Sequence, residues 1–392
     1  MSWEMARLGD VCVRIVDGSH NPPQAQKQYT KYMMLSSKNI LDGEVTTVQP
    51  RYLSEKHYIQ EHARTQVCAG DVLLTIVGTI GRVALICDNW EVYPTFQRSV
   101  AVLRPKEDLL SSFFLMYSLR CIRENLEKEA QGNSQKGLYL NQIENITIPL
   151  PPLDEQRRIA AEIERQFAAV ERAKKAAEEQ LAAARRLNPA YLREVFEGNE
   201  WDKVKLGEVC EQAIETISPN KGDEIVYIDI SSVDNISKRI IAMSIISAKN
   251  APSRAKQILK PNDIILSTVR PNLNALAMND ITIDKTIVAS TGFCVLRCKT
   301  KLDYRYLFQF CMSDALINNL SDIAKGSSYP AVTNTDIFEQ TIPIPPIDEQ
   351  RRIAAEIERQ FAAVERAKQA VMEQLDTINA LPAAILRQAF SG

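Results

Sequence analysis

The sequence predicts an α+β protein in which two similar mixed α/β domains alternate with two long helices, giving an internal pseudo-two-fold repeat. The first observation is that the segment 154–174 recurs unchanged at 348–368, 194 residues later. Each copy follows a proline-rich hinge and carries apolar residues at heptad spacing, which is typical of a coiled coil. The segments before the hinges contain short β-type runs divided by Gly, Pro, Asn and Ser. The predicted order is therefore variable domain, constant helix, variable domain, constant helix.

The two variable segments match each other only at scattered positions, which indicates one fold with two different surfaces. Asp71-Val-Leu-Leu matches Asp263-Ile-Ile-Leu, and Val102-Leu-Arg104 matches Val295-Leu-Arg297. We expect strands in 71–77, 82–86, 99–103, 224–230, 263–269 and 292–296, and closing amphipathic helices near 112–129 and 304–323. The predicted domain limits are 1–148 for the first variable domain, 149–198 for the first hinge and helix, 199–342 for the second variable domain and 343–392 for the second hinge and helix.

The constant helices are predicted to pair within the chain as a coiled coil. Their apolar residues lie seven apart, at Ile163, Val170, Ala177 and Ala184 in the first copy and at Ile357, Val364, Val371, Ile378 and Ile385 in the second. Asp154 and Asp348 are expected to be helix N-caps. Pro189 and Pro382 are expected to kink or end each helix, leaving a short terminal helix such as Ala383–Phe390.

The outward faces of the constant helices are also identical, although the pairing itself requires no identity there. The recurring charged residues are Glu162, Arg165, Glu171 and Arg172 in the first copy, and Glu356, Arg359, Glu365 and Arg366 in the second. The functional interpretation is that two copies of one partner bind these two faces. The alternative is a recent duplication that has not diverged. Because the flanking domains have diverged almost completely, we favour partner binding.

Composition limits the classes of function. The net charge of −2 and the pI of about 6.1 argue against indiscriminate attraction to a polyanion, so local patches or a basic partner must supply most phosphate contacts. No run approaches the roughly 20 apolar residues that cross a bilayer, and no secretory signal is recognisable, so a cytoplasmic protein is expected. The 8 cysteines form no C-x-x-C pair and are expected to be buried apolar residues.

No catalytic constellation emerges from the sequence. Asn21-Pro22-Pro23-Gln24 resembles an adenine methyltransferase motif, but Gln24 replaces its aromatic residue and no glycine-rich cofactor loop accompanies it. Gly78-Thr-Ile-Gly81 is too short for a dinucleotide fingerprint, and a Walker A segment is absent. The 3 histidines, His20, His57 and His62, have no equivalents in the second variable domain. We therefore predict no catalytic residue, no metal site and no cofactor on this chain, which favours a reader over an enzyme.

These residues carry a family resemblance over the whole chain. The blocks Ile148-Pro-Leu-Pro-Pro-Leu-Asp-Glu-Gln-Arg-Arg-Ile159 and Ile342-Pro-Ile-Pro-Pro-Ile-Asp-Glu-Gln-Arg-Arg-Ile353 resemble the conserved regions of DNA specificity subunits of type I restriction-modification systems. The segments Trp3 to Asp10, Asp17-Gly-Ser-His20, Gly78-Thr-Ile-Gly81 and Ala389-Phe390-Ser-Gly392 are similar too. The duplicated hinge block is specific, whereas the matches inside the variable domains are individually weak.

The resemblance implies that each variable domain is a target recognition domain reading one half of a bipartite, asymmetric double-stranded DNA site. It also implies that the paired helices set the distance between the halves and dock two methyltransferase subunits, with two restriction subunits completing the complex. S-adenosylmethionine, ATP and magnesium are then expected on partner subunits. This chain would be a non-catalytic subunit.

Residues expected to contact DNA were chosen for hydrogen-bonding capacity and loop position. In the first domain they are His20, Lys38, Thr79, Arg82, Gln97, Arg98, Gln135 and Lys136. In the second domain they are Ser232, Arg254, Arg270, Asn272, Asn274, Lys325, Ser328 and Tyr329. For each of them a solvated or structural role is the competing interpretation.

Two other functions are compatible with parts of the sequence. A solitary DNA methyltransferase requires a cofactor motif, so S-adenosylmethionine binding by the isolated chain would distinguish it. A scaffold of two adaptor domains on a coiled coil, with no nucleic acid bound, is compatible with the acidic pI. The partners recovered with the chain would separate that scaffold from a specificity subunit.

Overall fold

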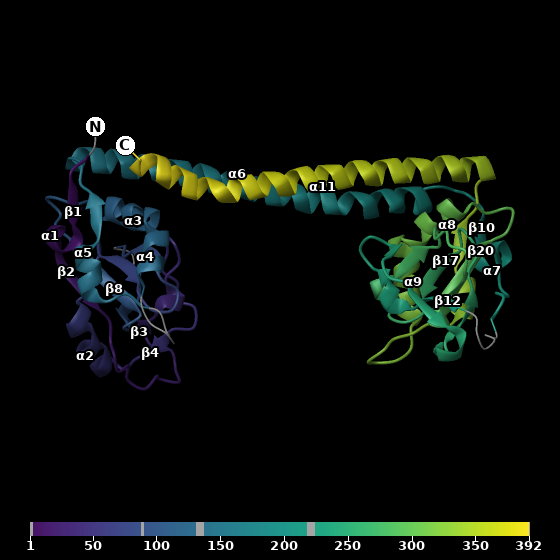
Figure 1. The fold of residues 1–392 in the computed structure, drawn as a ribbon, viewed down its shortest axis with the longest axis horizontal. Helices are drawn as coiled ribbons and strands as arrows, with labels where there is room; N and C mark the ends of the chain where they lie inside the picture. Colours follow the sequence, from purple (N-terminus) through teal and green to yellow (C-terminus); the bar gives the residue numbers. More distant parts are fainter. Residues whose placement is uncertain (1–2, 88–89, 131–136, 218–223, 392) are drawn as a thin grey trace. The chain divides into compact units, whose positions relative to one another are not determined.

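The computed structural model describes residues 3–87, 90–130, 137–217 and 224–391. The chain forms two compact units, one of Met1–Ala177 with Gln374–Gly392 and one of Glu178–Glu373. Each unit contains one β-rich domain together with a part of each long helix (Figure 1). The fold is the predicted mixed α/β repeat.

The first β-rich domain is built on an antiparallel sheet with strand order β2-β8-β5-β6. A second sheet, of order β4-β3-β7, pairs β3 in parallel with β7, and a ribbon of β1 and β9 closes the domain. Helix α3 packs against strands of both the main sheet and the ribbon. The strand bounds are β1 Met5–Arg7, β2 Cys12–Asp17, β3 Tyr32–Leu35, β4 Arg51–Tyr52, β5 Val72–Thr75, β6 Val83–Leu85, β7 Tyr93–Phe96, β8 Val100–Pro105 and β9 Thr147–Pro149.

The second β-rich domain has the same arrangement of a main sheet, a second sheet and a closing ribbon, but its second sheet has different edge strands. Its antiparallel sheet has the order β11-β20-β17-β18, its second sheet the order β15-β12-β19-β16, and its closing ribbon pairs β10 with β21. A further hairpin joins β13 to β14. The bounds are β10 Lys203–Lys205, β11 Cys210–Glu211, β12 Glu224–Ile228, β13 Val233–Asp234, β14 Arg239–Ile240, β15 Ser244–Ser247, β16 Ala255–Ile258, β17 Ile264–Ser267, β18 Leu276–Met278, β19 Thr286–Ser290, β20 Phe293–Cys298 and β21 Thr341–Pro343. The strands expected from the sequence are confirmed in both domains.

Short helices complete the domains. In the first they are α1 Leu8–Val11, η1 Ser37–Asn39, α2 Glu55–Thr65, α3 Ser112–Cys121, α4 Arg123–Glu129 and α5 Leu140–Asn145. In the second they are α7 Leu206–Val209, η2 Ile230–Ser232, η3 Ala248–Asn250, η4 Pro271–Leu273, α8 Tyr304–Cys311, α9 Asp314–Ile323 and α10 Asn334–Phe338. The closing helix expected in each domain is therefore divided in two. In the second domain Ser313 causes the break, because its hydroxyl accepts a hydrogen bond from the backbone N–H of Leu316 and starts a new helix.

The long helices are α6, Leu153–Glu197, and α11, Ile347–Phe390. The expectation that a proline would end them is wrong, because Pro189 and Pro382 both lie inside the helices. A proline removes one backbone hydrogen bond. Buried residues flank each proline, namely Ala184 and Leu192 around Pro189, and Ile378 and Leu386 around Pro382. The expectation that Asp154 and Asp348 are N-caps is also wrong. Each lies inside the first turn, where its charge still complements the helix dipole.

The two long helices pack against each other in opposite directions within each unit. In the first unit, Ile159 and Ile163 of α6 share a core with Leu386 near the end of α11. In the second unit, Leu192 and Phe196 near the end of α6 share a core with Ile353 and Ile357 at the start of α11. The heptad residues are buried or half-buried along both helices. The predicted pairing within the chain is confirmed.

A buried glutamine fixes the start of each long helix to its domain. Gln156 is 0% exposed, and its Nε2 donates to the carbonyl oxygens of Leu109 and Pro151 while its Oε1 accepts from the N–H of Ser111. Gln350 is also 0% exposed and makes the same set of bonds with Lys301, Pro345 and Asp303. A buried amide must have its donors and acceptors satisfied. The glutamine of the repeated block therefore has a structural role in both copies.

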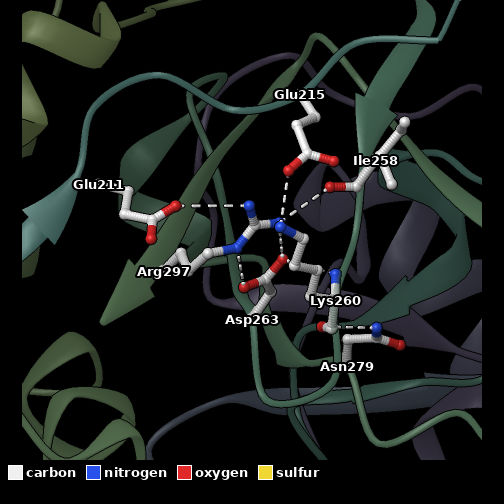
Figure 2. Close-up of polar contacts among 7 residues, drawn as sticks. All are labelled: Glu211, Glu215, Ile258, Lys260, Asp263, Asn279 and Arg297. Atoms are coloured by element: carbon white, nitrogen blue, oxygen red, sulfur yellow. Dashed lines mark hydrogen bonds and ion pairs between the residues drawn. The ribbon is translucent and has the colours of Figure 1, made fainter. Parts of the chain in front are cut away.

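A buried ion pair recurs in the two antiparallel sheets. Arg297 donates from Nε and Nη2 to the carboxylate of Asp263 at 2.9 and 2.7 Å and from Nη2 to the carbonyl of Ile258 (Figure 2). Arg104 and Asp71 form the same bidentate pair, at 2.8 and 2.9 Å. These four residues belong to the scattered sequence matches between the domains. The matches therefore mark the framework that the domains share.

The cysteines are all free thiols. Cys12, Cys210, Cys294 and Cys311 are buried as expected, whereas Cys68 and Cys87 are exposed, so the expectation of burial is wrong for those two. Burial raises the pKa of the Cys12 thiol to about 12. Over the described parts of the chain, no helix is both long enough and apolar enough to span a membrane.

Candidate nucleic-acid interface

Loops from separate parts of the first domain meet at one edge of its main sheet. The N–H of Arg98 donates to the carbonyl of Ser19, and the N–H of Ile76 donates to the carbonyl of Ser99. The N–H of Ser37 donates to the hydroxyl of Ser99. The segment that begins at Gly137 joins them, because the N–H of Leu138 donates to the carbonyl of Ile76. We call this edge, which joins the segments around Ser19, Ser37, Ile76, Arg98 and Leu138, the domain 1 edge.

A groove of about 540 Å³ opens on the domain 1 edge. His20 and Arg98 of the predicted set line it, together with Asp17, Arg64 and Tyr139. Asp17 is 8% exposed and binds the Nε2 of His20 at 2.6 Å and the guanidinium of Arg64. Because Asp17 orients both groups, the His20 ring and the Arg64 guanidinium present fixed hydrogen-bonding atoms to the groove.

Four further residues predicted for the first domain lie within the described part of the chain and differ in exposure. Lys38 on η1 and Thr79 in the β5–β6 turn are exposed. Gln97 and Arg82 are half-buried, and Gln97 forms an isolated parallel bridge with Ser19. Gln135 and Lys136 fall outside the described residues.

The second domain has an equivalent edge, held by equivalent hydrogen bonds. Val332 donates to the carbonyl of Thr268, and Thr268 donates to the carbonyl of Gly292. The loop 325–331 is closed by two backbone bonds between Lys325 and Ala331, and Ala331 also bridges to Val269. This domain 2 edge brings together four predicted residues, namely Arg270, Lys325, Ser328 and Tyr329.

The remaining residues predicted for the second domain differ in exposure. Arg254 and Asn272 are exposed. Ser232 is 7% exposed and completes a capping box with Asp229. Asn274 is 5% exposed and donates from Nδ2 to the carbonyl of Cys311. The structure therefore gives Ser232 and Asn274 structural bonds, and their contact with DNA stays a prediction.

Four polar groove residues of the first domain are absent from the set predicted from the sequence, namely Asp17, Arg64, Tyr139 and Asn141. Arg64 lies at the end of α2, whose N-cap Ser54 accepts from the N–H of His57. The serine before the acidic residue Glu55 was the available signal for this helix. Tyr139 and Asn141 come shortly after Leu138, whose N–H donates to the carbonyl of Ile76 and so places this segment at the groove.

One pair of the recurring charges on the long helices has the same geometry in both copies. Arg165 pairs with Glu162 at 2.6 Å, and Arg359 pairs with Glu356 at 2.5 Å. Side-chain hydrogen bonds from Gln166 and Arg165 lower the pKa of Glu162, and bonds from Arg359 and Gln360 lower the pKa of Glu356. Glu171, Arg172, Glu365 and Arg366 are exposed. The repeated sequence therefore presents two equivalent charged surfaces.

Metal-dependent chemistry was not expected of this chain. Within residues 3–87, 90–130, 137–217 and 224–391, His, Cys, Asp and Glu side chains form no group of three or more that could hold a metal ion.

The fold and its two loop edges define a class of protein, a duplicated recognition subunit whose two β-rich domains are each joined to a long helix at a proline hinge. The family model described as the type I restriction modification DNA specificity domain matches residues 1–180 and again 198–374. The chain belongs to this family and is a specificity subunit, the non-catalytic component for DNA recognition in a type I restriction-modification system. Such subunits act with DNA and with other subunits of the complex.

Relatives and solved structures agree with the assignment. The chain is 22% identical to the type I restriction enzyme MjaVIII specificity subunit of Methanocaldococcus jannaschii, covering 96% of this chain and 92% of that protein. It is 30% identical to the EcoBI specificity subunit of Escherichia coli over 41% of this chain and 34% of that protein. The crystal structure of the HsdS subunit from Thermoanaerobacter tengcongensis has the same fold, with a TM-score of 0.69, 23% identity, and coverage of 100% of this chain and 97% of that one.

Proposed function

We propose that this chain reads a bipartite, asymmetric double-stranded DNA site, with one half-site bound by each β-rich domain. The exposed members of the predicted set are the proposed DNA contacts at the two edges. We also propose that one methyltransferase subunit docks on each helical repeat, that restriction subunits join through the complex, and that S-adenosylmethionine, ATP and magnesium bind to those partners. The domain limits 1–148, 149–198, 199–342 and 343–392 and a cytoplasmic location belong to the same proposal.

The single observation that carries the proposal is the contrast between the repeated helices and the diverged edges. The charged faces around Arg165 and Arg359 are identical in sequence and equivalent in geometry. The domain 1 edge has a histidine–aspartate–arginine groove, whereas the domain 2 edge has an arginine and a tyrosine on a closed loop. The two identical charged faces support one kind of partner that is bound twice. The two different edges support two different half-sites.

The charge of the chain is consistent with shared DNA binding. With a net charge of −2, this subunit alone neutralises few phosphates. We infer that the methyltransferase subunits contribute most of the phosphate contacts, while the edges of this chain contribute base contacts. The affinity of the isolated chain for DNA should then be weak and should rise sharply when its partners bind.

Native mass spectrometry of the chain with its methyltransferase subunit tests the docking. The intact chain should bind two methyltransferase subunits. Arg165→Glu should remove one of them, Arg359→Glu should remove the other, and the double variant should bind none, because each reversal places like charges on one docking face. The proposal is wrong if the intact chain saturates with one methyltransferase subunit, or if both single variants still bind two.

Lys175→Glu is the matched control. Lys175 is exposed on the same helix, but the second copy has Gln369 at the equivalent place, so this charge is not part of the repeated face. The control should keep two methyltransferase subunits. Loss of a subunit in this variant would attribute the effect to net charge and count against a specific face.

A further inference from the structure

Arg270 has a backbone conformation that favours glycine. Its φ and ψ are 50° and 63°, in the left-handed region, immediately before η4. The equivalent position in the first domain is Gly78, with φ of 83°. The equivalence follows from the preceding residues, because Val77 bridges to Gly137 just as Val269 bridges to Ala331. Glycine adopts this backbone conformation without strain, so the first domain is unstrained at the position where the second domain has an arginine.

Backbone hydrogen bonds hold Arg270 in this conformation. Its N–H donates to the carbonyl of Pro330 at 2.7 Å. Its carbonyl accepts from the N–H of Leu273 across η4. The loop 325–331 that supplies Pro330 is itself closed by the paired bonds between Lys325 and Ala331. Strain maintained by surrounding structure is common at functional sites, so this position is a candidate for a functional role.

The Arg270 guanidinium has a defined orientation and no anionic partner. Its central carbon lies 4.6 Å from the centre of the Tyr329 ring, and its Nη2 donates to the carbonyl of Ser328 at 3.5 Å. Among the described residues, the side-chain contacts of Arg270 are those with Tyr329 and Ser328, and neither is a carboxylate. Arg270 is exposed, and Tyr329 is 69% exposed. The remaining N–H donors therefore face solvent as a fixed fork.

We propose that Arg270 reads a guanine in the half-site of the second domain, and that Tyr329 is the positioning residue that holds the guanidinium plane. A planar guanidinium donates two parallel hydrogen bonds to O6 and N7 of guanine in the major groove. Stacking on an aromatic face fixes that plane, a role that a lysine cannot perform. This inference rests on the proposed function, because it presupposes that the domain 2 edge meets DNA.

The geometry favours a base edge over a phosphate. A phosphate contact requires a positive charge near the backbone, and exposed Lys325 on the same loop supplies one. A phosphate contact does not require a guanidinium whose plane is held by the Tyr329 ring and the Ser328 carbonyl. It also does not require a backbone in the left-handed region. These features restrict direction, as two parallel hydrogen bonds to O6 and N7 of one guanine require.

The test is methylation-site mapping with the full complex on a DNA library with randomised half-sites. Arg270→Gly relieves the backbone strain, so the chain should fold at least as well as the original. It should reduce discrimination for one guanine about 10- to 100-fold and leave the other positions unchanged. Arg270→Lys keeps the charge and should lose the same preference. Tyr329→Leu should weaken it, whereas Tyr329→Phe, which keeps the ring, should retain it.

Lys203→Ala is the control. Lys203 is exposed on β10, so this substitution removes one positive charge from the same domain but away from the domain 2 edge. Its profile should equal that of the original chain. The inference is overturned if Arg270→Gly weakens all sequences alike, which indicates a phosphate contact, or if Arg270→Lys keeps the guanine preference. Failure of the original complex to methylate any bipartite site would instead overturn the proposed function.

Discussion

Arg297 and Asp263 form a bidentate ion pair in which the Asp263 side chain is 1% exposed and the Arg297 side chain 10% exposed. The first domain repeats the pair with Arg104 and Asp71, but there the arginine side chain is 28% exposed. In both domains the carboxylate also accepts a backbone N–H three residues upstream, from Lys260 or from Cys68. The pair therefore joins two neighbouring strands to the turn that precedes one of them.

Replacing Arg297 by leucine should destabilise the second domain by about 3–5 kcal/mol, because it leaves the Asp263 carboxylate buried without its cation. Denaturant unfolding, with hydrogen exchange measured on β17 and β20, would locate the loss. The Lys203→Ala control should stay within about 0.5 kcal/mol of the original chain. Adding Asp263→Leu should recover much of the loss, and a single variant that unfolds like the original chain would contradict this role.

Replacing Gln156 or Gln350 by alanine should cost about 1–3 kcal/mol each, because buried backbone groups lose their partners. Gln156→Ala should affect the first domain and Gln350→Ala the second. Exposed Gln369 on the same helix as Gln350 provides a control, and its alanine variant should be near neutral. Equal protection of Ser111 and Asp303 amides from exchange in wild-type and variant chains would show that these bonds are dispensable.

The first domain should be less stable at mildly acidic pH because of His62. Burial first, and Arg14 second, lower the pKa of His62 below 6.5. The His62 ring stacks on Tyr58 at 5.0 Å. A lowered pKa means that the folded state disfavours the proton on His62. The contribution of His62 to the free energy of unfolding is therefore fully present above about pH 6.5. It decreases as the pH drops toward the pKa of the folded state and is constant below that pKa.

His62→Phe keeps an aromatic ring and removes the titration. The difference in unfolding free energy between this variant and the original chain should therefore change between neutral pH and about pH 5, in favour of the variant. Melting curves across that range measure it. A constant difference would show that His62 titrates equally in both states.

The sequence predicted the elements whose pattern is local. Heptad spacing located α6 and α11, and β-type runs located β5, β6 and β8 of the first antiparallel sheet and β17 and β20 of the second. The runs did not locate β2, β11 or β18. It could not predict that β3 pairs with β7 in parallel, because Tyr32 and Tyr93 are remote in the chain and neither run alternates clearly. Continuation of the helices through Pro189 and Pro382 depends on contacts made by residues of the other helix.

The candidate site was predictable in composition but not in arrangement. Loop position and hydrogen-bonding capacity identified His20 and Arg98, which the structure brings into one groove with Asp17. Nothing in the sequence indicated that Arg64, from a separate helix, would share that carboxylate. For Arg270 the informative feature is its backbone torsion φ. The sequence could not predict this torsion, because an arginine is rarely found at positive φ.

The most direct test of the central claim is methylation-site mapping with lengthened helices. One heptad is inserted into α6 after Ala177 and one into α11 after Glu373, where the two units divide, so that the pairing within each unit is kept. Each insertion adds about 10 Å of helix. With a rise of about 3.4 Å per base pair, the gap between half-sites should grow by up to about three base pairs. Inserting four residues instead breaks the heptad and should cost stability.

The account predicts an active complex whose half-site bases are unchanged and whose gap is longer. An active complex with an unchanged gap would show that the helices do not set the spacing. Altered bases in either half-site, or a single contiguous site in the original complex, would contradict two independent readers on one chain.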